Sequence, residues 1–452
     1  MYKKPVLALF LFFIISAAVL LSAENDKKTE KNITVREERI ETIKYGIDAE
    51  VINLITDLKK ENNTDYNDEL LKLVKTSRNN TLRETVIGFF KDQKNPQAVN
   101  FAFDQIQNNY LLSNESIIKY ISYISDYQNS GITDYLVTLF NHENEPLADA
   151  AIDAVGKSGE SAYGKKLLEL LKDSDISDSK KIHVIGALGK LKYKEAGEEI
   201  AKYLEKDYTD NRSLRWKACV ALGELGDENS LPIIINLFSD NDPYLRKYAI
   251  ESLGYFPPEK TEDIVIEGLR DSSWRVRISA AQSLGHMKSK KAVPILIYKA
   301  KKDPDIKNVR NASIKALSEI GTSDSLKFLR EMLSDDKTNI QNRTTALAAL
   351  IETDLGGSLK YISELIDTEW GKPSSYLLDY TCKLLSREKN GKLKDLYTKM
   401  LTYTKTANLK IYALRGIKLN KMTSLKETVQ KLAEDDKDKR IQHLASDVLD
   451  SL

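Results

Sequence analysis

The stretch NDPYLRKYAIESLGYF, residues 241–256, returns 31 residues later as SSWRVRISAAQSLGHM, residues 272–287. In both stretches the apolar residues recur at the spacing of one helix face and end on a Leu-Gly pair, with the leucines at Leu253 and Leu284. A helical pattern that returns at an interval of about 20 to 50 residues is typical of an array of repeats that pack only on their neighbours. The duplication therefore predicts an elongated helical protein.

The position of this leucine can be followed along most of the chain. Nearly equal steps connect Val155, Leu188, Leu222, Leu253, Leu284, Leu317 and Leu350. Steps of similar length extend the series outward to Ile87, Ile121, Leu384, Ile417 and Leu449. Small residues stand one and four positions before the leucine in the central repeats, which places them on the same face of the first helix. They allow helices of neighbouring repeats to approach closely, and we expect the glycine after the leucine to end that helix in a left-handed conformation.

A second, more aliphatic helix follows in each repeat, with a proline in its first turn at Pro232 and Pro294. The fold class expected is all-α, a right-handed α-solenoid (α/α superhelix) of about 12 helix pairs. The chain then divides into divergent N-terminal helical repeats at 46–144, well-matched repeats at 145–354 and divergent C-terminal helical repeats at 355–452.

The first 45 residues differ from the repeats. Residues 1–23 have a basic start, 16 apolar residues at 6–21 and a small residue, Ala23, before the chain turns polar, which is the order of a secretory signal peptide. We therefore expect export to the periplasm or cell envelope, with membrane contact only through this segment if it stays uncleaved. Residues 24–45 are charged and expected to be flexible, with a helix favoured around 36–43.

The repeats over 145–354 follow the pattern D-x-x-P-x-V/L-R-x-x-A-x-x-A/S-L-G and then a Leu-rich helix. This pattern resembles the HEAT repeat, and the short repeats resemble the HEAT-like repeats named for phycobilisome lyases. The resemblance implies a solenoid with a long concave face, on which we expect the second helices to lie. It implies almost nothing about an activity.

Charged residues recur in the same register. The resemblance implies that they form a structural ladder, in which each aspartate binds an arginine or a backbone N–H of an adjacent repeat. An arginine suits this role because its planar fork binds a carboxylate through two hydrogen bonds. The ladder residues expected are Asp240, Arg246, Asp271, Arg277, Asp303, Arg310, Asp336 and Arg343.

The sequence offers little chemistry. It has no nucleophile-elbow, zinc-protease or phosphate-loop motif, and its two cysteines, Cys219 and Cys382, stand in apolar helical stretches. Deoxyhypusine hydroxylases resemble this architecture and hold iron with several His-Glu pairs, but this chain has the single pair His142-Glu143. We expect no cofactor and no metal. A net charge of +1 gives no reason to expect a nucleic-acid partner.

The interpretation favoured is a non-enzymatic scaffold or adaptor that binds a protein partner, of unknown identity, along the concave face. Aromatic residues and arginine dominate the energetics of such surfaces. The residues expected to contact the partner are Glu267, Trp274, Tyr298, Lys299 and Arg330. Two alternatives remain open: an enzyme, lyase-like or of another kind, whose site lies in the divergent terminal repeats, and a glycan-binding module with aligned aromatic side chains.

Overall fold

The computed structural model describes residues 35–108, 111–127, 129–205, 210–305, 307–372 and 374–452, and over these residues it is helical, with no strand. The apolar run expected to be a signal peptide lies outside this part of the chain. Residues 35–45, at the end of the charged segment, form a helix in which Ile43 is buried. No helix in the described ranges combines the length and the apolar character needed to cross a bilayer.

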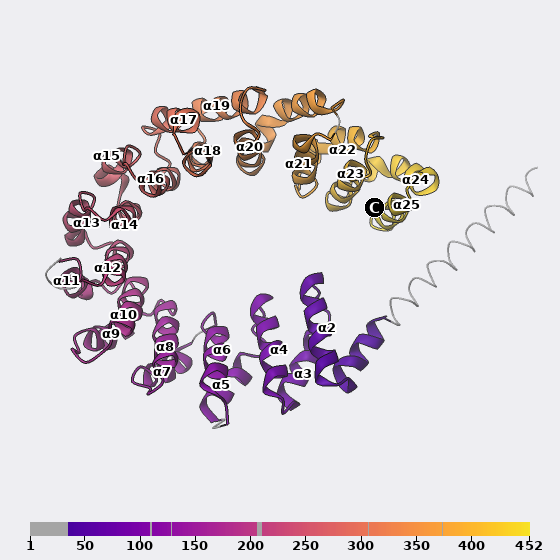
Figure 1. Ribbon diagram of the computed structural model, residues 1–452. Helices are drawn as coiled ribbons and strands as arrows, with labels where there is room; N and C mark the ends of the chain where they lie inside the picture. Colours follow the sequence, from indigo (N-terminus) through magenta and orange to yellow (C-terminus); the bar gives the residue numbers. More distant parts are fainter. Residues whose placement is uncertain (1–34, 109–110, 128, 206–209, 306, 373) are drawn as a thin grey trace, which may run out of the picture. The chain divides into compact units, whose positions relative to one another are not determined.

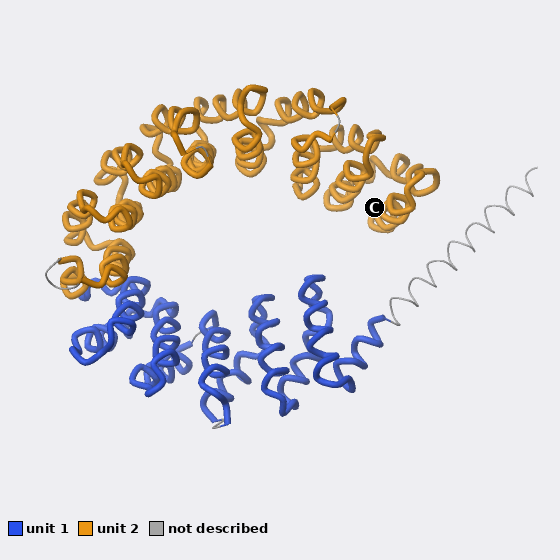
Figure 2. Tube along the Cα trace, in the orientation of Figure 1, with its two compact units in different colours: residues 1–196 blue, residues 197–452 orange. Residues whose placement is uncertain are grey.

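The chain divides into two compact units, residues 1–196 and 197–452, each of which is a row of packed helices (Figures 1 and 2). Unit 1 contains α2 (Asp48–Glu61), α3 (Asn67–Thr76), α4 (Asn80–Asp92), α5 (Val99–Asn108), α6 (Asn114–Ile124), α7 (Ser130–Thr138), α8 (Glu145–Lys157), α9 (Gly164–Leu171) and α10 (Asp178–Lys190). Helices α2, α4, α6, α8 and α10 form one layer and pack on each other in sequence, and the intervening helices form the other layer.

Unit 2 contains α11 (Gly197–Lys202), α12 (Arg212–Leu225), α13 (Leu231–Leu237), α14 (Pro243–Leu253), α15 (Pro258–Gly268), α16 (Trp274–His286), α17 (Val293–Lys302), α18 (Asn308–Ile320), α19 (Ser323–Ser334), α20 (Ile340–Glu369), α21 (Tyr376–Leu385), α22 (Lys394–Leu401), α23 (Asn408–Leu419), α24 (Lys426–Asp435) and α25 (Lys439–Leu449). Helix α20 includes both helices of one repeat, because the chain kinks at Asp354 (φ −146°, ψ 41°) without an intervening loop. The architecture is thus the expected all-α solenoid.

The glycine of the Leu-Gly pair has a different role from the one expected. Gly156, Gly223 and Gly285 lie inside helices α8, α12 and α16, and the left-handed glycines that cap α12 and α18 are Gly226 and Gly321. The expectation of a left-handed helix end at the Leu-Gly pair is therefore wrong.

The reason for these glycines is close approach between repeats. A Cβ on Gly223 would lie 2.6 Å from the Cβ of Ser252, and a Cβ on Gly156 would lie 2.7 Å from the Cα of Ala187. Ser252 and Ala187 are the small residues that stand directly before the aligned leucine of the next repeat. Each glycine therefore makes room for the backbone of the following first helix, at a distance that no side chain tolerates.

The small residues also decide the direction of curvature inside unit 2. The first helices α12, α14, α16 and α18 pack on one another more extensively than the second helices α13, α15, α17 and α19 do. Figure 2 shows unit 2 as a curved row, and the labels in Figure 1 place the first helices on its inner side. The expectation that the second helices line the concave side is therefore wrong, because the row closes toward the helices that carry the small residues.

Candidate functional site

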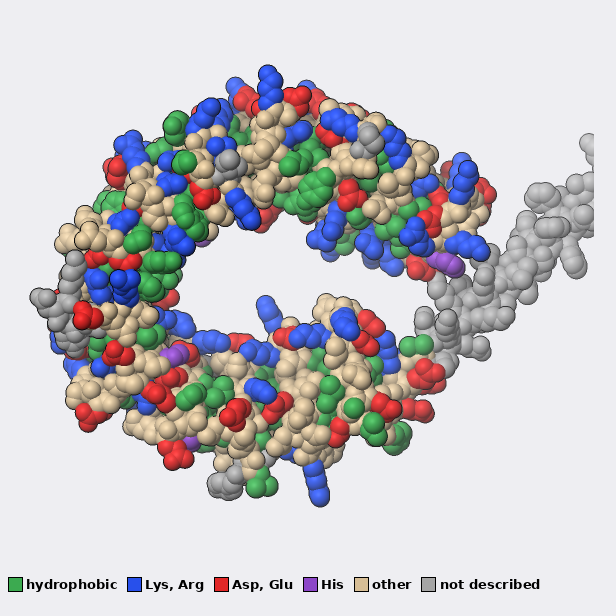
Figure 3. All heavy atoms as spheres, viewed as in Figure 1, with side chains coloured by type: hydrophobic (Ala, Val, Ile, Leu, Met, Phe, Trp, Pro, Cys, Tyr) green, Lys and Arg blue, Asp and Glu red, His purple; other side chains and the backbone are tan. Residues whose placement is uncertain are grey.

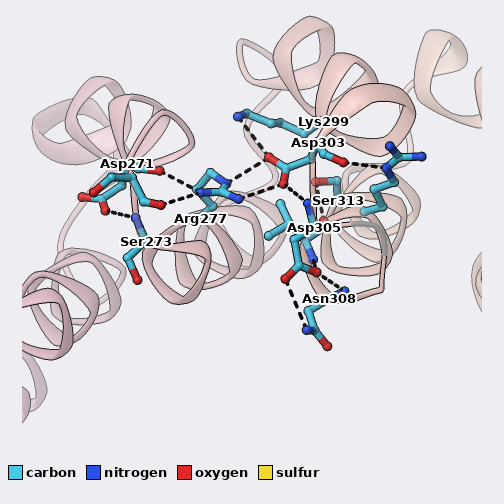
Figure 4. A network of polar contacts seen from close by, with 11 residues as sticks. Asp271, Ser273, Arg277, Lys299, Asp303, Asp305, Asn308 and Ser313 are labelled. Carbon is cyan, nitrogen blue, oxygen red and sulfur yellow. Dashed lines mark hydrogen bonds and ion pairs between the residues drawn. The ribbon is translucent and has the colours of Figure 1, made fainter.

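The charged residues in the turns of unit 2 form a ladder that links consecutive repeats (Figure 4). Arg246 on α14 donates from Nε and Nη2 to Asp271, at 2.8 and 2.9 Å. Arg277 on α16 binds Asp303 in the same way, with both distances 2.9 Å, and Arg215 on α12 donates to Asp240 at 3.1 Å. Each arginine thus binds the aspartate of the next repeat. We call these six residues the Asp–Arg ladder.

The ladder residues also fix the turns in which they lie. Arg277 donates from Nη1 to the carbonyl oxygen of Asp271 at 2.9 Å, in the turn that precedes its own helix. Asp303 accepts the backbone N–H of Asp305 at 3.0 Å, and Asp271 accepts that of Ser273 at 2.7 Å. One arginine therefore connects the turn of its own repeat with the turn of the following repeat, which sets their register.

These contacts favour the ionised form of two ladder carboxylates, Asp271 and Asp303. Burial alone would raise the pKa of Asp303, but the Arg277 fork, the N–H of Asp305 and the ammonium group of Lys299 outweigh burial and hold this pKa below its ordinary value of 3.8. At Asp271 burial also raises the pKa, but the hydrogen bonds from Arg246 and from the N–H of Ser273 outweigh it, so the pKa of this carboxyl is lowered as well. A depressed folded-state pKa contributes stability that is present above the unfolded pKa and is lost as the pH falls through the folded one.

We therefore predict that the contribution of Asp271 and Asp303 to stability begins to fall below about pH 4 and is lost as the pH falls through their lowered folded-state pKa values. The melting temperature of the protein should fall steeply between pH 4 and pH 2.5, as followed by circular dichroism. The double variant Arg277→Met/Asp303→Leu, which lacks one ladder pair, should show a shallower fall over the same range. Parallel pH profiles for the two proteins would contradict the assignment.

Three of the expected ladder residues do not form this contact. Asp336 is exposed, and its neighbour Asp335 stands in the ladder position, because it accepts the N–H of Lys337 just as the other ladder aspartates accept an N–H two residues later. Arg310 donates from Nε to the carbonyl oxygen of Asp303 at 2.8 Å, and Arg343 donates to that of Leu333 at 3.0 Å. Asp336 is therefore not a ladder residue, since the turn before α20 places its carboxylate in solvent.

Four of the five residues expected to contact a partner lie on second helices. Lys299 binds a ladder residue instead, with its ammonium group 3.1 Å from Asp303. Arg330 on α19 binds Asp354 and Ser358 beside the kink of α20. Glu267 on α15 and Tyr298 on α17 are exposed, but both stand on the outer layer of unit 2.

The fifth, Trp274, belongs to a row of stacked side chains on the first helices. The guanidinium carbon of Arg275 lies 4.3 Å from the ring centroid of Trp274 and 5.1 Å from that of Tyr244. The ring of Tyr244 lies 5.1 Å from Trp216, and the ring of Tyr248 lies 6.0 Å from Trp216. These five residues, which we call the aromatic row, connect α12, α14 and α16.

The aromatic row is both accessible and rigid. Tyr244 and Trp274 are 38% and 36% exposed, and Trp216 is fixed because its Nε1 donates to Asp242 at 2.8 Å. Figure 3 shows hydrophobic side chains exposed among basic and acidic ones on the inner side of unit 2. Rigid aromatic rings with an arginine between them lose little conformational entropy on contact, and such residues dominate protein interfaces.

The sequence contains a signal that groups three aromatic residues, of which only Trp274 was predicted to contact a partner. Trp216 follows a ladder arginine directly, Tyr244 precedes one by two positions, and Trp274 precedes one by three. Positions three or four apart share a helix face, so these three positions lie close together once the repeats are superposed. Tyr248, two positions after a ladder arginine, extends the row along α14.

A polar groove continues the first-helix layer beyond the aromatic row. It has a volume of about 610 Å³ and lies among α18, α20 and α21. Tyr376 and Tyr380 form one wall with stacked rings, 5.8 Å apart at 16°, and Asn311, Gln341 and Glu352 are among its polar lining. Tyr376 is 62% exposed, so the groove offers one aromatic surface among hydrogen-bonding groups.

The residues with potential for chemistry are placed as follows. Cys219 and Cys382 are buried, and burial raises the pKa of each thiol to about 12, so both are neutral. His142 accepts the N–H of Asn144 at 3.0 Å in the turn after α7. In the described part of the chain, no three His, Cys, Asp or Glu side chains are grouped closely enough to hold a metal ion.

Comparison with solved structures finds helical-repeat proteins at low identity. Human deoxyhypusine hydroxylase is 16% identical over 58% of this chain and 97% of its own, with a TM-score of 0.27. The complex of CpcE and CpcF of phycocyanin lyase from Nostoc sp. PCC7120 is 20% identical over 56% of this chain and 94% of its own, with a TM-score of 0.31. Yeast importin-beta (Kap95p) is 12% identical over 90% of this chain and 63% of its own, with a TM-score of 0.47. No curated protein sequence matches the chain.

The sequence model described as "Spirochaete HEAT repeat protein" matches residues 43–448. This match includes the divergent repeats at both ends as well as the central ones, and so covers nearly all of the described helices. The chain therefore belongs to the spirochaete HEAT repeat protein family.

Proposed function

We propose that this protein is a non-enzymatic scaffold or adaptor that binds a protein partner through the first-helix layer of unit 2. The aromatic row carries the proposal, because Trp216, Tyr244, Trp274 and Arg275 form a continuous, partly exposed surface across three consecutive repeats. Residues of these types provide most of the binding energy at interfaces. The polar groove beside α21 supplies hydrogen-bonding groups at the edge of the same layer.

We also propose that the protein acts in the periplasm or cell envelope. The basic start, the apolar run at 6–21 and the small residue Ala23 support export to the periplasm or cell envelope. Cell fractionation, with determination of the N-terminal residue of the isolated protein, tests this. Recovery of the full-length chain in the cytoplasmic fraction would overturn it.

The binding proposal is tested by crosslinking in cells of the source organism, followed by mass spectrometry of the partners. The variant Tyr244→Ala/Trp274→Ala removes two exposed rings of the aromatic row and should reduce the yield of the specific crosslinked partner about tenfold or more. The matched control is Tyr298→Ala, which removes an exposed ring, 60% accessible, from α17 in the outer layer. The control should retain the crosslink.

Two results would count against the proposal. Equal crosslinking by the aromatic-row variant and the control would show that this surface does not carry binding. A crosslink that Tyr298→Ala removes and Tyr244→Ala/Trp274→Ala retains would assign binding to the outer layer. Melting curves of both variants verify that neither result comes from unfolding.

A further inference from the structure

The Asp–Arg ladder opens at the step between α18 and α20. Arg310 follows Arg277 in the series, and Asp335 is the aspartate in the ladder position of the next repeat. In the described part of the chain, no hydrogen bond or ion pair connects the two, although the three preceding steps are closed. Asp335 instead accepts the hydroxyl of Thr338 at 2.9 Å and is exposed. The fork of Arg310 therefore lacks the carboxylate that the preceding ladder arginines bind.

A cleft of about 470 Å³ occupies this step, between the C-terminal end of α17 and the start of α20. Its lining includes four basic residues, Arg310, Lys301, Lys302 and Lys337, and two acidic ones, Glu331 and Asp335. The ammonium group of Lys301 lies over the ring of Phe328, at 4.9 Å from the centroid, and Phe328 is also part of the lining. The excess of cations favours a ligand that carries a negative charge.

Asn342 provides a second, independent sign that the cleft takes a ligand. Its side chain lines the cleft and is 3% exposed, and its Oδ1 has no hydrogen-bond partner within the described residues. The residues that hold this position in the four preceding repeats are apolar and buried: Leu214, Leu245, Val276 and Val309. A buried, unpaired amide oxygen costs free energy that an apolar residue would not, and a donor from a ligand in the cleft would remove this cost.

We propose that this cleft binds an acidic peptide segment of the partner, with a carboxylate on the Arg310 fork and a backbone N–H on Oδ1 of Asn342. In the closed steps Asp271 and Asp303 bind the Nε and Nη2 groups of an arginine at 2.8 to 2.9 Å. Nε of Arg310 already donates to the carbonyl oxygen of Asp303 at 2.8 Å, so the partner's carboxylate binds its two Nη groups. The inference rests on the proposed function, since it names the chemistry of a protein partner. Glu331 and Asp335 in the lining disfavour a polyanion such as nucleic acid, because its phosphates would meet both carboxylates.

The probe for this site is a peptide that reproduces a turn of the ladder itself. The segment FSDNDP, residues 238–243, contains Asp240 in its ladder turn. We would use it acetylated, amidated and labelled with fluorescein, and measure its binding to the full chain by fluorescence anisotropy. In the control peptide both aspartates are changed to asparagine. Its affinity should be lower by about tenfold or more, because charge-assisted bidentate hydrogen bonds are stronger than neutral ones.

The protein variants separate the guanidinium fork from its charge. Arg310→Gln should weaken binding of the acidic peptide about tenfold, and Arg310→Lys should give an intermediate loss, because it keeps the charge and loses the fork. Arg270→Gln is the matched control: it removes an arginine with a side chain 67% exposed, outside the cleft, and should leave binding unchanged. Asn342→Leu should raise the melting temperature while it weakens binding, a combination that damage to the fold does not produce.

Several results would overturn the proposal. Equal binding of the two peptides, or an equal loss of affinity in Arg310→Gln and Arg270→Gln, would contradict a carboxylate-binding site at Arg310. Displacement of the peptide by inorganic phosphate at the same concentration would show that the cleft binds anions in general and does not select an acidic peptide. Unchanged peptide affinity in Asn342→Leu would show that Oδ1 of Asn342 accepts no hydrogen bond from the peptide. Peptide binding should survive Tyr244→Ala/Trp274→Ala, so a failure here is distinguishable from a failure of the aromatic row.

Discussion

Replacement of Arg277 by alanine should lower the free energy of unfolding of its part of unit 2 by about 3–5 kcal/mol, as expected when one partner of a buried ion pair is removed. The side chains of Arg277 and Asp303 are 8% and 0% exposed, so the aspartate would remain buried without its main counterion. The carbonyl oxygens of Asp271 and Ser272 would also lose their donor. Thermal unfolding, followed by circular dichroism, should show a lower melting temperature.

The location of the loss is as informative as its size. Each repeat of a solenoid contacts only its neighbours, so amide hydrogen exchange should increase in α14, α16 and α18 and much less elsewhere. Arg270→Ala, which removes an exposed arginine paired with Glu267 at 3.6 Å, is the control and should change stability by no more than about 0.5 kcal/mol. An unchanged melting curve for Arg277→Ala would contradict the ladder as a stabilising element.

Replacement of Gly223 by leucine should destabilise unit 2 by about 2–3 kcal/mol, the upper part of the range for overpacking. A Cβ at this position would lie 2.6 Å from the Cβ and 2.8 Å from the Cα of Ser252, and the Cα cannot move without a shift of α14. The helices α12 and α14 would therefore have to separate, which would also loosen the packing around Leu222 and Leu253. Thermal melting and hydrogen exchange in these two helices measure the effect.

Gly88→Ala is the matched control for this prediction. Gly88 is also a helical glycine, in α4, but a Cβ there would meet no atom within 4 Å. Because alanine has the higher helix propensity, Gly88→Ala should stabilise the protein by up to about 1 kcal/mol. A stabilised Gly223→Leu variant, or equal effects at the two positions, would show that close approach between repeats is not the reason for Gly223.

The register of the repeats could be read from the sequence because it depends on local patterns. Leu222, Leu253, Leu284 and Leu317 recur at nearly constant spacing, and each of them is fully buried. The same spacing indicated which charged residues recur in the turns. It did not indicate which of two adjacent aspartates, Asp335 or Asp336, faces the ladder, since that depends on the conformation of one turn.

The role of the Leu-Gly glycine was misassigned for a physical reason. A glycine near the end of a helical pattern is compatible both with a left-handed cap and with a close helix contact, and the sequence alone does not separate the two. The distance from Gly223 to Ser252 decides it, and that distance exists only between two packed repeats. The prediction that the second helices line the concave side was wrong because the curvature, too, depends on the packing between repeats.

The sequence by itself determined that the protein is a linear array of helix pairs, because an apolar stripe that returns at a nearly constant interval can be buried only against a copy of itself. Only the tertiary structure decided which layer is concave in unit 2, which aromatic rings share one surface and which ladder arginine lacks its aspartate. Those features depend on distances between residues of neighbouring repeats, such as Arg275 with Tyr244 and Arg310 with Asp335. Such distances are set by the packing of whole helices and by the conformation of single turns, which a repeating pattern does not encode.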